Sequence, residues 1–246
     1  MAREKKPSKT LSQWGIDLPM IVTKVIDERD TSRPDDGYFH SSSINKCSRS
    51  VYFNKVLGKP DNKKAKFPPT AKMAMHLGHS IHDLLQEALH QATDIEFEDE
   101  IPLVSKPDLL AGTCDGVVTF TNNDGERDKL IIEIKSTNST WYNDKFIYAP
   151  KPEHYMQLQT YMYMSGIHKG IILYFNKDNA RMATHDIEYD EPYIEKVLRK
   201  LHYTTECVTN ESTPTMFLSC KDTTRLDKQC ANYLRCKNFE TGKPVE

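Results

Sequence analysis

Two apolar segments that flank an Asn/Asp/Gly-rich turn constrain the fold of this chain more than any other feature of its sequence. The segments are LLAGTCDGVVTF (109–120) and RDKLIIEIKS (127–136), and the turn between them is TNNDGE. This pattern is typical of a β-hairpin. Asp115 and Glu133 each lie nine residues from Asp124. A loop that is symmetric about Asp124 therefore places the two carboxylates opposite each other, with Cβ atoms roughly 4.5–5.5 Å apart.

The alternation of residues along this hairpin predicts two different faces. Lys135 is two residues past Glu133, so it points to the same side of the strand as Glu133 and Asp115. The other side is expected to form the core, with Val118, Phe120, Leu130, Ile132 and Ile134. We therefore expect one face to be core and the other to gather charge. A solvated strand face with a cross-strand salt bridge is the ordinary alternative, and a slip of one residue would turn Glu133 to the wrong face.

The charged face suggests a chemistry as well as a structure. Two carboxylates that converge on one point repel each other unless a cation lies between them. Oxygen ligands of this kind suit Mg²⁺ or Mn²⁺. A lysine beside such a metal can orient a water molecule or stabilise developing negative charge. The arrangement therefore suits hydrolysis of a phosphodiester bond.

The remaining segments predict an α/β domain. Helices are expected from a cap among Ser41, Ser42 and Ser43 to about Leu57, over 70–93, over 153–166 and over 191–208. Residues 94–104 alternate like a strand, and 170–190 form a second hairpin signal. Residues 1–37 are expected to be a partly flexible arm, and 38–246 a single domain whose cysteine-bearing region, 207–240, is irregular around 213–239.

Composition excludes several classes of protein. The 246 residues suit one large domain, and no apolar run suggests a membrane span or a secretory signal. We therefore expect a cytoplasmic protein of a bacterium or a phage-infected cell, with no membrane partner. The formal net charge of -2 argues against binding a polyanion through the overall field, but leaves room for a local basic groove. In a reducing compartment, clustered cysteines more often bind metal or do redox chemistry than form disulfides.

Three motifs together resemble a known family. Asp115 followed by Glu133-Ile134-Lys135 resembles the PD-(D/E)XK nuclease superfamily, with Cys114 where the name has proline. Gly78 to His82 is similar to the GxxxH motif of RecB-type nuclease domains. Gln157 to Tyr161 is similar to their QxxxY motif, although Gln159 and Tyr163 have the same spacing. The resemblance runs from about residue 40 to residue 240.

The resemblance implies a fold and a set of roles. The fold is a restriction-endonuclease-like α/β core, with a mixed sheet flanked by helices. His82, Asp115, Glu133 and the Ile134 carbonyl would bind Mg²⁺ or Mn²⁺, and Lys135 would act on the attacking water and the transition state. Gln157 and Tyr161 would lie near the lysine and the DNA backbone. The plain alternatives are a histidine at the edge of the core and ordinary packing of an amphipathic helix.

The cysteines extend the resemblance to the iron–sulfur RecB-like nucleases. One upstream cysteine and three near the C-terminus, Cys47, Cys220, Cys230 and Cys236, would hold a [4Fe–4S] cluster, or equally a Zn²⁺ ion. The cluster would join the N- and C-terminal parts of the domain. Its last spacing, C-x5-C, matches the family, but the C-x9-C interval before it is wide, and Cys207 is the substitute for Cys220. Unlinked reduced cysteines are the alternative, and Cys114 is expected to be a small buried residue.

Two further groups are candidates for contact with DNA. Lys63, Lys64 and Lys66 form a basic stretch that could meet phosphates or be a solvated linker. Trp141 and Tyr142 could stack on unpaired bases or cover the core.

By resemblance, the chain is a metal-dependent DNA exonuclease that acts on ends or single strands in recombination, repair or replication. A CRISPR-type nuclease that trims spacer ends within an integrase complex is one alternative, and a non-catalytic DNA-binding or complex-forming module is another. A helicase, a single-strand annealing protein or an integrase would be a fitting partner, and an oligomer is compatible with the family.

Overall fold

The fold was analysed in a computed structural model, which describes residues 17, 21–22, 24–25, 36–58, 69–215 and 230–245. The main helices are α2 (Ser48–Val56), α3 (Pro69–His90), α5 (Pro152–Ser165), α6 (Glu191–Thr209) and α7 (Tyr233–Glu240). The strands are β1 (Phe39–His40), β2 (Ile95–Ser105), β3 (Leu110–Thr121), β4 (Arg127–Thr137), β5 (Lys169–Asn176) and β6 (Met182–Glu188). Two short helical turns, α4 (Ser139–Trp141) and η1 (Tyr142–Phe146), follow β4.

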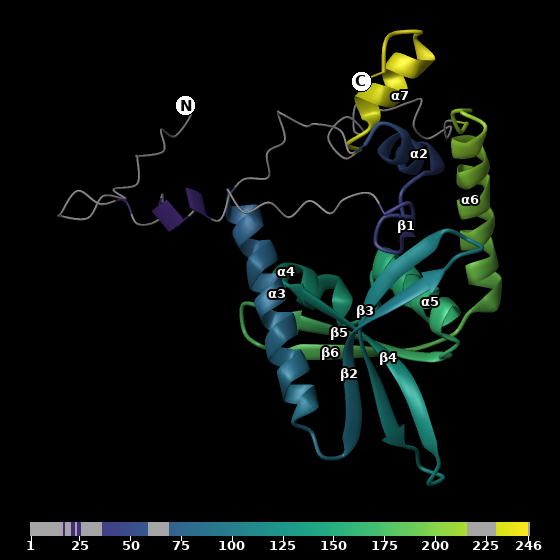
Figure 1. Ribbon diagram of the computed structural model, residues 1–246. Coiled ribbons are helices and arrows are strands. Elements are labelled where there is room, and N and C mark those ends of the chain that lie inside the picture. The colour runs from purple at the N-terminus through teal and green to yellow at the C-terminus, as the bar shows by residue number, and fades with distance from the viewer. Residues whose placement is uncertain are drawn as a thin grey trace.

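The six strands form one mixed sheet (Figure 1). β3 pairs antiparallel with β2 and with β4, β4 pairs parallel with β5, and β5 pairs antiparallel with β6. The short β1 lies parallel to the start of β3. The predicted α/β fold, a mixed sheet flanked by helices, is confirmed.

The register of the β3–β4 hairpin is the predicted one. Gly116 pairs with Ile132, and the pairs continue to Thr121 with Arg127, so every pair is symmetric about Asp124. The hairpin pairing ends at Gly116 and Ile132, next to Asp115 and Glu133. The two carboxylates therefore lie at the point where the two strands separate.

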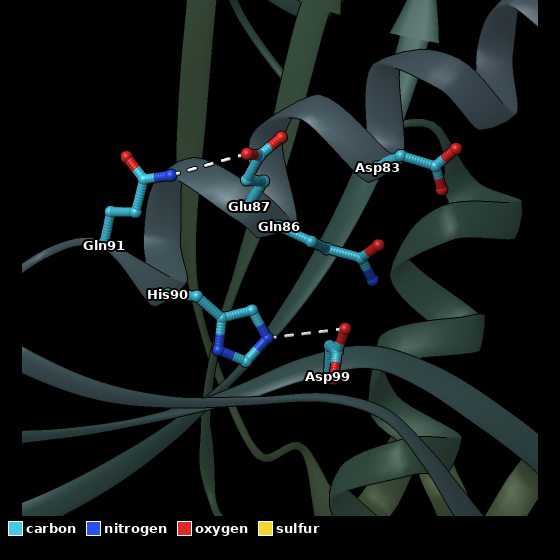
Figure 2. Close-up of a pocket in the computed structure, with 6 residues that line it drawn as sticks. All are labelled: Asp83, Gln86, Glu87, His90, Gln91 and Asp99. Carbon is cyan, nitrogen blue, oxygen red and sulfur yellow. Dashed lines mark hydrogen bonds and ion pairs between the residues drawn. The ribbon is translucent and has the colours of Figure 1, made fainter.

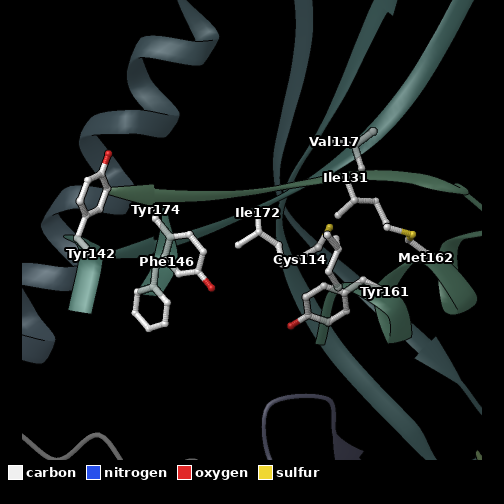
Figure 3. Close-up of a cluster of buried hydrophobic side chains, with 10 residues drawn as sticks. Cys114, Val117, Ile131, Tyr142, Phe146, Tyr161, Met162, Ile172 and Tyr174 are labelled. Carbon is white, nitrogen blue, oxygen red and sulfur yellow. The ribbon is translucent and has the colours of Figure 1, made fainter. Parts of the chain in front are cut away.

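The predicted core face is confirmed and the charged residues do share the other face, but helices cover both sides of the sheet, so the charged side is covered as well. On one side Val118, Ile132 and Ile134 pack with side chains of α3. On the other side Val117 and Ile131 pack with Leu158 and Met162 of α5 and with Ile172 and Tyr174 of β5, and much of this cluster is drawn in Figure 3. Glu133 shares its side of β4 with Ile131 and is fully buried. The charge therefore lies inside the packed layer between sheet and α5.

Two element boundaries also differ from the prediction. The first long helix begins at Ser48, where the Cys47 Sγ accepts a hydrogen bond from Ser50 N as the cap. Ser41 is buried and donates to the Ala111 carbonyl instead. The segment expected to be irregular contains α7 in its last part, since Tyr233–Glu240 is helical. Most of the arm at 1–37 lies outside the described residues, so the domain division stays a prediction.

No helix in the described part of the chain is both long enough and apolar enough to cross a membrane.

Candidate active site

The point where β3 and β4 separate, here called the fork, is bridged by the side chain of Asp115. The Asp115 Oδ2 accepts a hydrogen bond from Ile134 N at 2.6 Å, just beyond the last pair of the hairpin. This bond turns the Asp115 carboxylate toward β4 where the strands part. The hairpin thereby brings Asp115, Glu133 and Lys135 together, as the sequence predicted.

Glu133 is a buried carboxylate without a hydrogen bond. Neither of its oxygens has a hydrogen-bond partner, and its charge is balanced by an ion pair with the Lys135 ammonium. Burial, together with the negative Asp115, raises the pKa of Glu133 to about 7. Burial opposes the charge of Lys135, but Glu133 and Asp115 raise the pKa of this lysine nonetheless. A buried carboxylate whose Oε1 contacts the Lys135 ammonium and whose Oε2 has no hydrogen-bond partner costs free energy and is a place for a bound cation.

Helix α3 brings the third predicted ligand to the fork. His82 Nδ1 lies 3.5 Å from Asp115 Oδ1. The GxxxH spacing has a physical reason here, because a Cβ atom on Gly78 would lie 3.2 Å from Ser136 Oγ on β4. A residue without a side chain lets α3 lie close to the strand that carries Glu133 and Lys135.

These donors fit a divalent cation, although they are not yet arranged as a complete site. Within the described ranges, no three His, Cys, Asp or Glu side chains already converge as a metal-binding group. The donor set of two carboxylates and an imidazole suits Mg²⁺ or Mn²⁺. The unsatisfied oxygens of Glu133, beside Asp115, are the observation that favours a cation at this point.

The QxxxY motif lies on α5, over the same side of the sheet. Gln157 Nε2 donates to the Tyr161 hydroxyl at 2.9 Å. Tyr161 is buried, and burial with the nearby Glu133 raises the pKa of its phenol well above the usual range, so the hydroxyl keeps its proton. A Cβ atom on Gly112 would lie 2.5 Å from the Tyr161 ring, so β3 needs glycine there.

The second pair with the same spacing has other partners. Gln159 donates to the Glu188 carbonyl and accepts from Asp190 N, and so joins α5 to the start of α6. Tyr163 donates to Asp108 at 2.7 Å. The structure thus assigns both residues of this second pair to contacts that hold the fold together.

One set of side chains beside Lys135, which surrounds Tyr174, was not predicted from the sequence. Tyr174 of β5 pairs with Lys135 in register and is fully buried. Its hydroxyl accepts from Lys151 N at 2.9 Å and lies 2.8 Å from His154 Nδ1. Phe146 stacks on the Tyr174 ring, with centroids 4.7 Å apart. No local spacing signals this group, because its members come from β5, α5 and the turn after β4.

His154 should make the stability of the protein depend on pH. Burial, with Lys135 and Lys151 nearby, lowers the pKa of His154 to about 3, against 6.5 in an unfolded chain. The stability from the neutral ring is present above pH 6.5 and is lost as the pH falls, because only the unfolded chain readily takes up the proton. Between pH 7 and pH 5 we expect a loss of about 2 kcal/mol in the free energy of unfolding.

Urea unfolding of the chelator-treated protein at the two pH values measures this loss. His154→Gln keeps a polar group opposite Tyr174 but does not titrate, so its stability should fall less between pH 7 and pH 5. An equal fall in both proteins would show that other groups cause the pH dependence.

The candidates for DNA contact differ in whether the structure describes them and in how exposed they are. Lys63, Lys64 and Lys66 lie outside the described residues. Tyr142 is 4% exposed and belongs to the core, so of the two roles left open by the sequence it has the packing role. Trp141 is 47% exposed, and Lys145 Nζ lies 4.6 Å from the centroid of its ring. An aromatic ring and a cation are thus presented together directly after the strand that carries Glu133.

Apart from Cys114, the described cysteines lie on or next to helices α2, α6 and α7. Cys47 caps α2, Cys230 lies three residues before the start of α7 and Cys236 lies within it, whereas Cys220 is outside the described residues. Cys207 of α6 packs in one buried cluster with Cys236. None of the five described cysteines forms a disulfide. Cys114 is fully buried in the core, as predicted.

Helices α2 and α7 are held together by specific contacts. Asn232 Nδ2 donates to Ser50 Oγ and to Asn54 Oδ1. Arg49 forms an ion pair with Glu240 at 2.6 Å, and the rings of Phe53 and Phe239 meet edge to face. The structure therefore joins the segment around Cys47 to the segment around Cys236.

Comparison with known proteins gives one family and several similar proteins. The model of a family described as YqaJ-like viral recombinase domain matches residues 39–168. The CRISPR-associated exonuclease Cas4 of Saccharolobus solfataricus is 25% identical over 183 residues, which cover 74% of this chain and 82% of that protein.

Two crystal structures of one enzyme share the fold. The alkaline exonuclease of Laribacter hongkongensis matches with a TM-score of 0.53 and 16% identity, over 83% of this chain and 95% of that one. The same exonuclease in complex with dAMP gives a TM-score of 0.52 and 18% identity, with the same coverage. The similarity to both structures extends over most of the chain.

Proposed function

This chain belongs to the family of YqaJ-like viral recombinase domains, and from that premise we propose that it is a metal-dependent exonuclease that hydrolyses the phosphodiester bonds of DNA from an end. Membership confirms the predicted PD-(D/E)XK, RecB-like class. The exonuclease relatives agree with the predicted enzyme activity.

One observation carries the proposal. Glu133 is fully buried, both of its oxygens lack hydrogen bonds, and Asp115 and Lys135 lie beside it. A fold that needed only packing at this position would be more stable with an apolar residue. The loss of stability is explained if the carboxylate binds a cation that arrives with the substrate.

Each residue at the fork then has a role. Mg²⁺ or Mn²⁺, held by His82, Asp115, Glu133 and the Ile134 carbonyl, would supply a Lewis acid and a more acidic bound water. The Lys135 ammonium orients the attacking water and offsets the negative charge on the non-bridging oxygens of the reacting phosphate. Gln157 and Tyr161 are hydrogen-bonded to each other on α5. They position the part of the site near Lys135 and contact the DNA backbone. Ile134 N fixes the Asp115 carboxylate.

The assembled motifs argue against a non-catalytic module. His82, Asp115, Glu133 and Lys135 come from three elements, and pairwise contacts join His82 to Asp115 and Lys135 to Glu133 at the end of the hairpin pairing. A DNA-binding fold without chemistry has no use for a fully buried carboxylate such as Glu133 in this set. The similarity to Cas4 supports the second candidate, a nuclease that trims ends within an integrase complex, and the same residues would do its chemistry.

Substrate topology tests the proposal. With Mn²⁺, the protein should convert linear end-labelled DNA to short products, and it should leave covalently closed circular DNA intact. A chelator should abolish the reaction. Cleavage of the circle at a rate similar to that of the linear DNA would indicate an endonuclease, and no cleavage of either would refute the enzyme.

Contact with DNA is proposed around Trp141. Its exposed ring beside Lys145 suits stacking on an unpaired base next to a phosphate. The dAMP complex of the Laribacter exonuclease supports a nucleotide ligand for this fold. Lys63, Lys64 and Lys66 stay candidates for phosphate contacts from the sequence, and a helicase, annealing or integrase partner stays part of the proposal.

An iron–sulfur cluster is proposed for the junction of α2 with α7. Cys47, Cys230 and Cys236 lie on the segments that meet there, and Cys220 or Cys207 would be the fourth thiolate. Zn²⁺ suits the same four ligands. A brown anaerobic preparation with iron and sulfide would support the cluster, a colourless protein with stoichiometric zinc would assign zinc, and a protein with neither would refute both.

A further inference from the structure

We propose that Gln86 is a positioning residue for the metal site, and that it holds the main chain of Asp115 so that the carboxylate faces Glu133 and His82. The inference rests on the proposed function. Gln86 belongs to none of the motifs that the family resemblance brought out.

Gln86 differs from its neighbours on the same surface. It is one of six residues that line a pocket of about 370 Å³ between α3 and β2, with Asp83, Glu87, His90, Gln91 and Asp99 (Figure 2). The other five are exposed, whereas Gln86 is only 6% exposed. A polar side chain buried to this degree needs hydrogen-bond partners.

The partners of Gln86 lie on two different strands. Its Nε2 group donates to the Asp115 main-chain oxygen at 2.8 Å and to the Glu100 Oε1 at 3.2 Å. An amide nitrogen has two protons, so one side chain can serve both acceptors. Gln86 thereby ties α3 to β3 and to β2 at the position of Asp115.

The β2–β3 ladder is irregular at this same position. Asp99 pairs with Gly116 and Ile101 with Cys114, but Glu100 and Asp115 between them are not paired. Glu100 has a φ of 46°, a left-handed conformation that residues with side chains rarely adopt. The main chain at Asp115 thus lacks the usual support of its neighbouring strand, and the bond from Gln86 supplies it.

One face of α3 therefore contacts both the side chain and the main chain of Asp115. His82 and Gln86 are four residues apart, so they lie on the same side of the helix. His82 meets the carboxylate, with Nδ1 3.5 Å from Oδ1, and Gln86 binds the main-chain oxygen of the same residue. Any movement of Asp115 away from Glu133 would break both contacts.

The test is the affinity for Mn²⁺ without DNA, measured by calorimetry on folded protein. Gln86→Met has a similar volume and no donor, and we expect its Kd for Mn²⁺ to rise about 10- to 100-fold, as for other residues that orient metal ligands. Excess Mn²⁺ should restore most of the rate of DNA hydrolysis. Gln91→Met is the matched control, since Gln91, the residue after α3, lines the same pocket and its side chain, among the described residues, donates only to Glu87.

Two more variants keep the test decisive. Gln86→Glu retains the shape of the side chain but has no proton to donate to the Asp115 oxygen, so it should lose Mn²⁺ affinity like Gln86→Met. Glu100→Gly removes the second acceptor and suits the left-handed backbone, so its Kd should change less than about threefold. Circular dichroism and thermal unfolding establish which variants are folded.

The outcomes separate the two claims. Folded Gln86→Met or Gln86→Glu protein that binds Mn²⁺ as tightly as wild type would overturn the positioning role. A lower unfolding temperature with an unchanged Kd would reduce Gln86 to a structural residue. Wild-type protein that binds Mn²⁺ but does not hydrolyse DNA would instead refute the proposed function and leave the positioning role standing.

Discussion

Replacing Glu133 by glutamine should lower the rate of Mn²⁺-dependent DNA hydrolysis by about 1000-fold while the protein stays folded. Glutamine has nearly the same shape as glutamate but carries no charge for a metal ion. The loss of one preorganised electrostatic contact in an active site typically costs about 100- to 1000-fold in rate, and a metal ligand belongs at the upper end. Glu133 is fully buried, which leaves little room for water to replace its carboxylate.

The measurement is the initial rate of product release from end-labelled linear DNA, with thermal unfolding of each protein beside it. Glu126→Gln is the control, because Glu126 is an exposed residue in the turn of the same hairpin. Its rate should equal that of wild type. A Glu133→Gln protein that keeps more than a tenth of the wild-type rate would refute the assignment of Glu133.

Replacing Gly116 by alanine should destabilise the protein more than most single substitutions. A Cβ atom at this position would overlap the ring of Phe97 and would lie 3.0 Å from the Glu98 main-chain oxygen. Phe97 is buried between β2 and α3, so its ring has little space to move. Overpacking of a core costs about 3 kcal/mol in a case this tight, which corresponds to a fall of roughly 6–12 °C in Tm for a chain of this size.

A second substitution checks the cause. Phe97→Leu alone should cost stability, but combined with Gly116→Ala it should recover part of the loss, because the smaller side chain makes room for the new methyl group. Thermal unfolding of the two single variants and the double variant measures this coupling. Strictly additive losses would show that the strain lies in the β3 main chain and not in the contact with Phe97.

The hairpin was the part of the site that the sequence could predict. Its turn is symmetric about Asp124, and its strands alternate strongly, so local rules determine which residues face each other. The register followed from these rules, and with it the meeting of Asp115 and Glu133 at the end of the pairing. The GxxxH and QxxxY motifs added His82, Gln157 and Tyr161 through a resemblance, and these residues do lie beside the fork or over it.

The burial of the charged residues could not be predicted from the hairpin alone. Alternation along β4 separates the side of Glu133 from the side of Ile132, but it does not say what covers each side. Helix α5 packs over Ile131 and Glu133 through contacts between distant segments. For the same reason, the roles of Gln86 and Tyr174 could not be predicted from the sequence, because their partners lie on other elements.

Helix boundaries were misjudged for local reasons. Three serines in a row suggested a cap at Ser41–Ser43, but the cap is the thiol of Cys47, an uncommon residue in that role. The short helix α7 has the sequence YLRCKNFE, which is only 8 residues long and so gives little periodic signal. It is stabilised by the bond from Asn232, its cap residue, to Ser50 of α2, and by the bond from Arg235 to the Gly58 carbonyl just after α2.

The most direct test of the account is the anomalous diffraction of crystals soaked in Mn²⁺. We predict one dominant anomalous peak at the fork of β3 and β4, within bonding distance of Asp115 and Glu133 and near His82. The ion pair of Lys135 with Glu133 should be rearranged to admit the metal. A protein that hydrolyses DNA with Mn²⁺, but whose anomalous peak lies elsewhere, would contradict the claim that these two carboxylates form the active site.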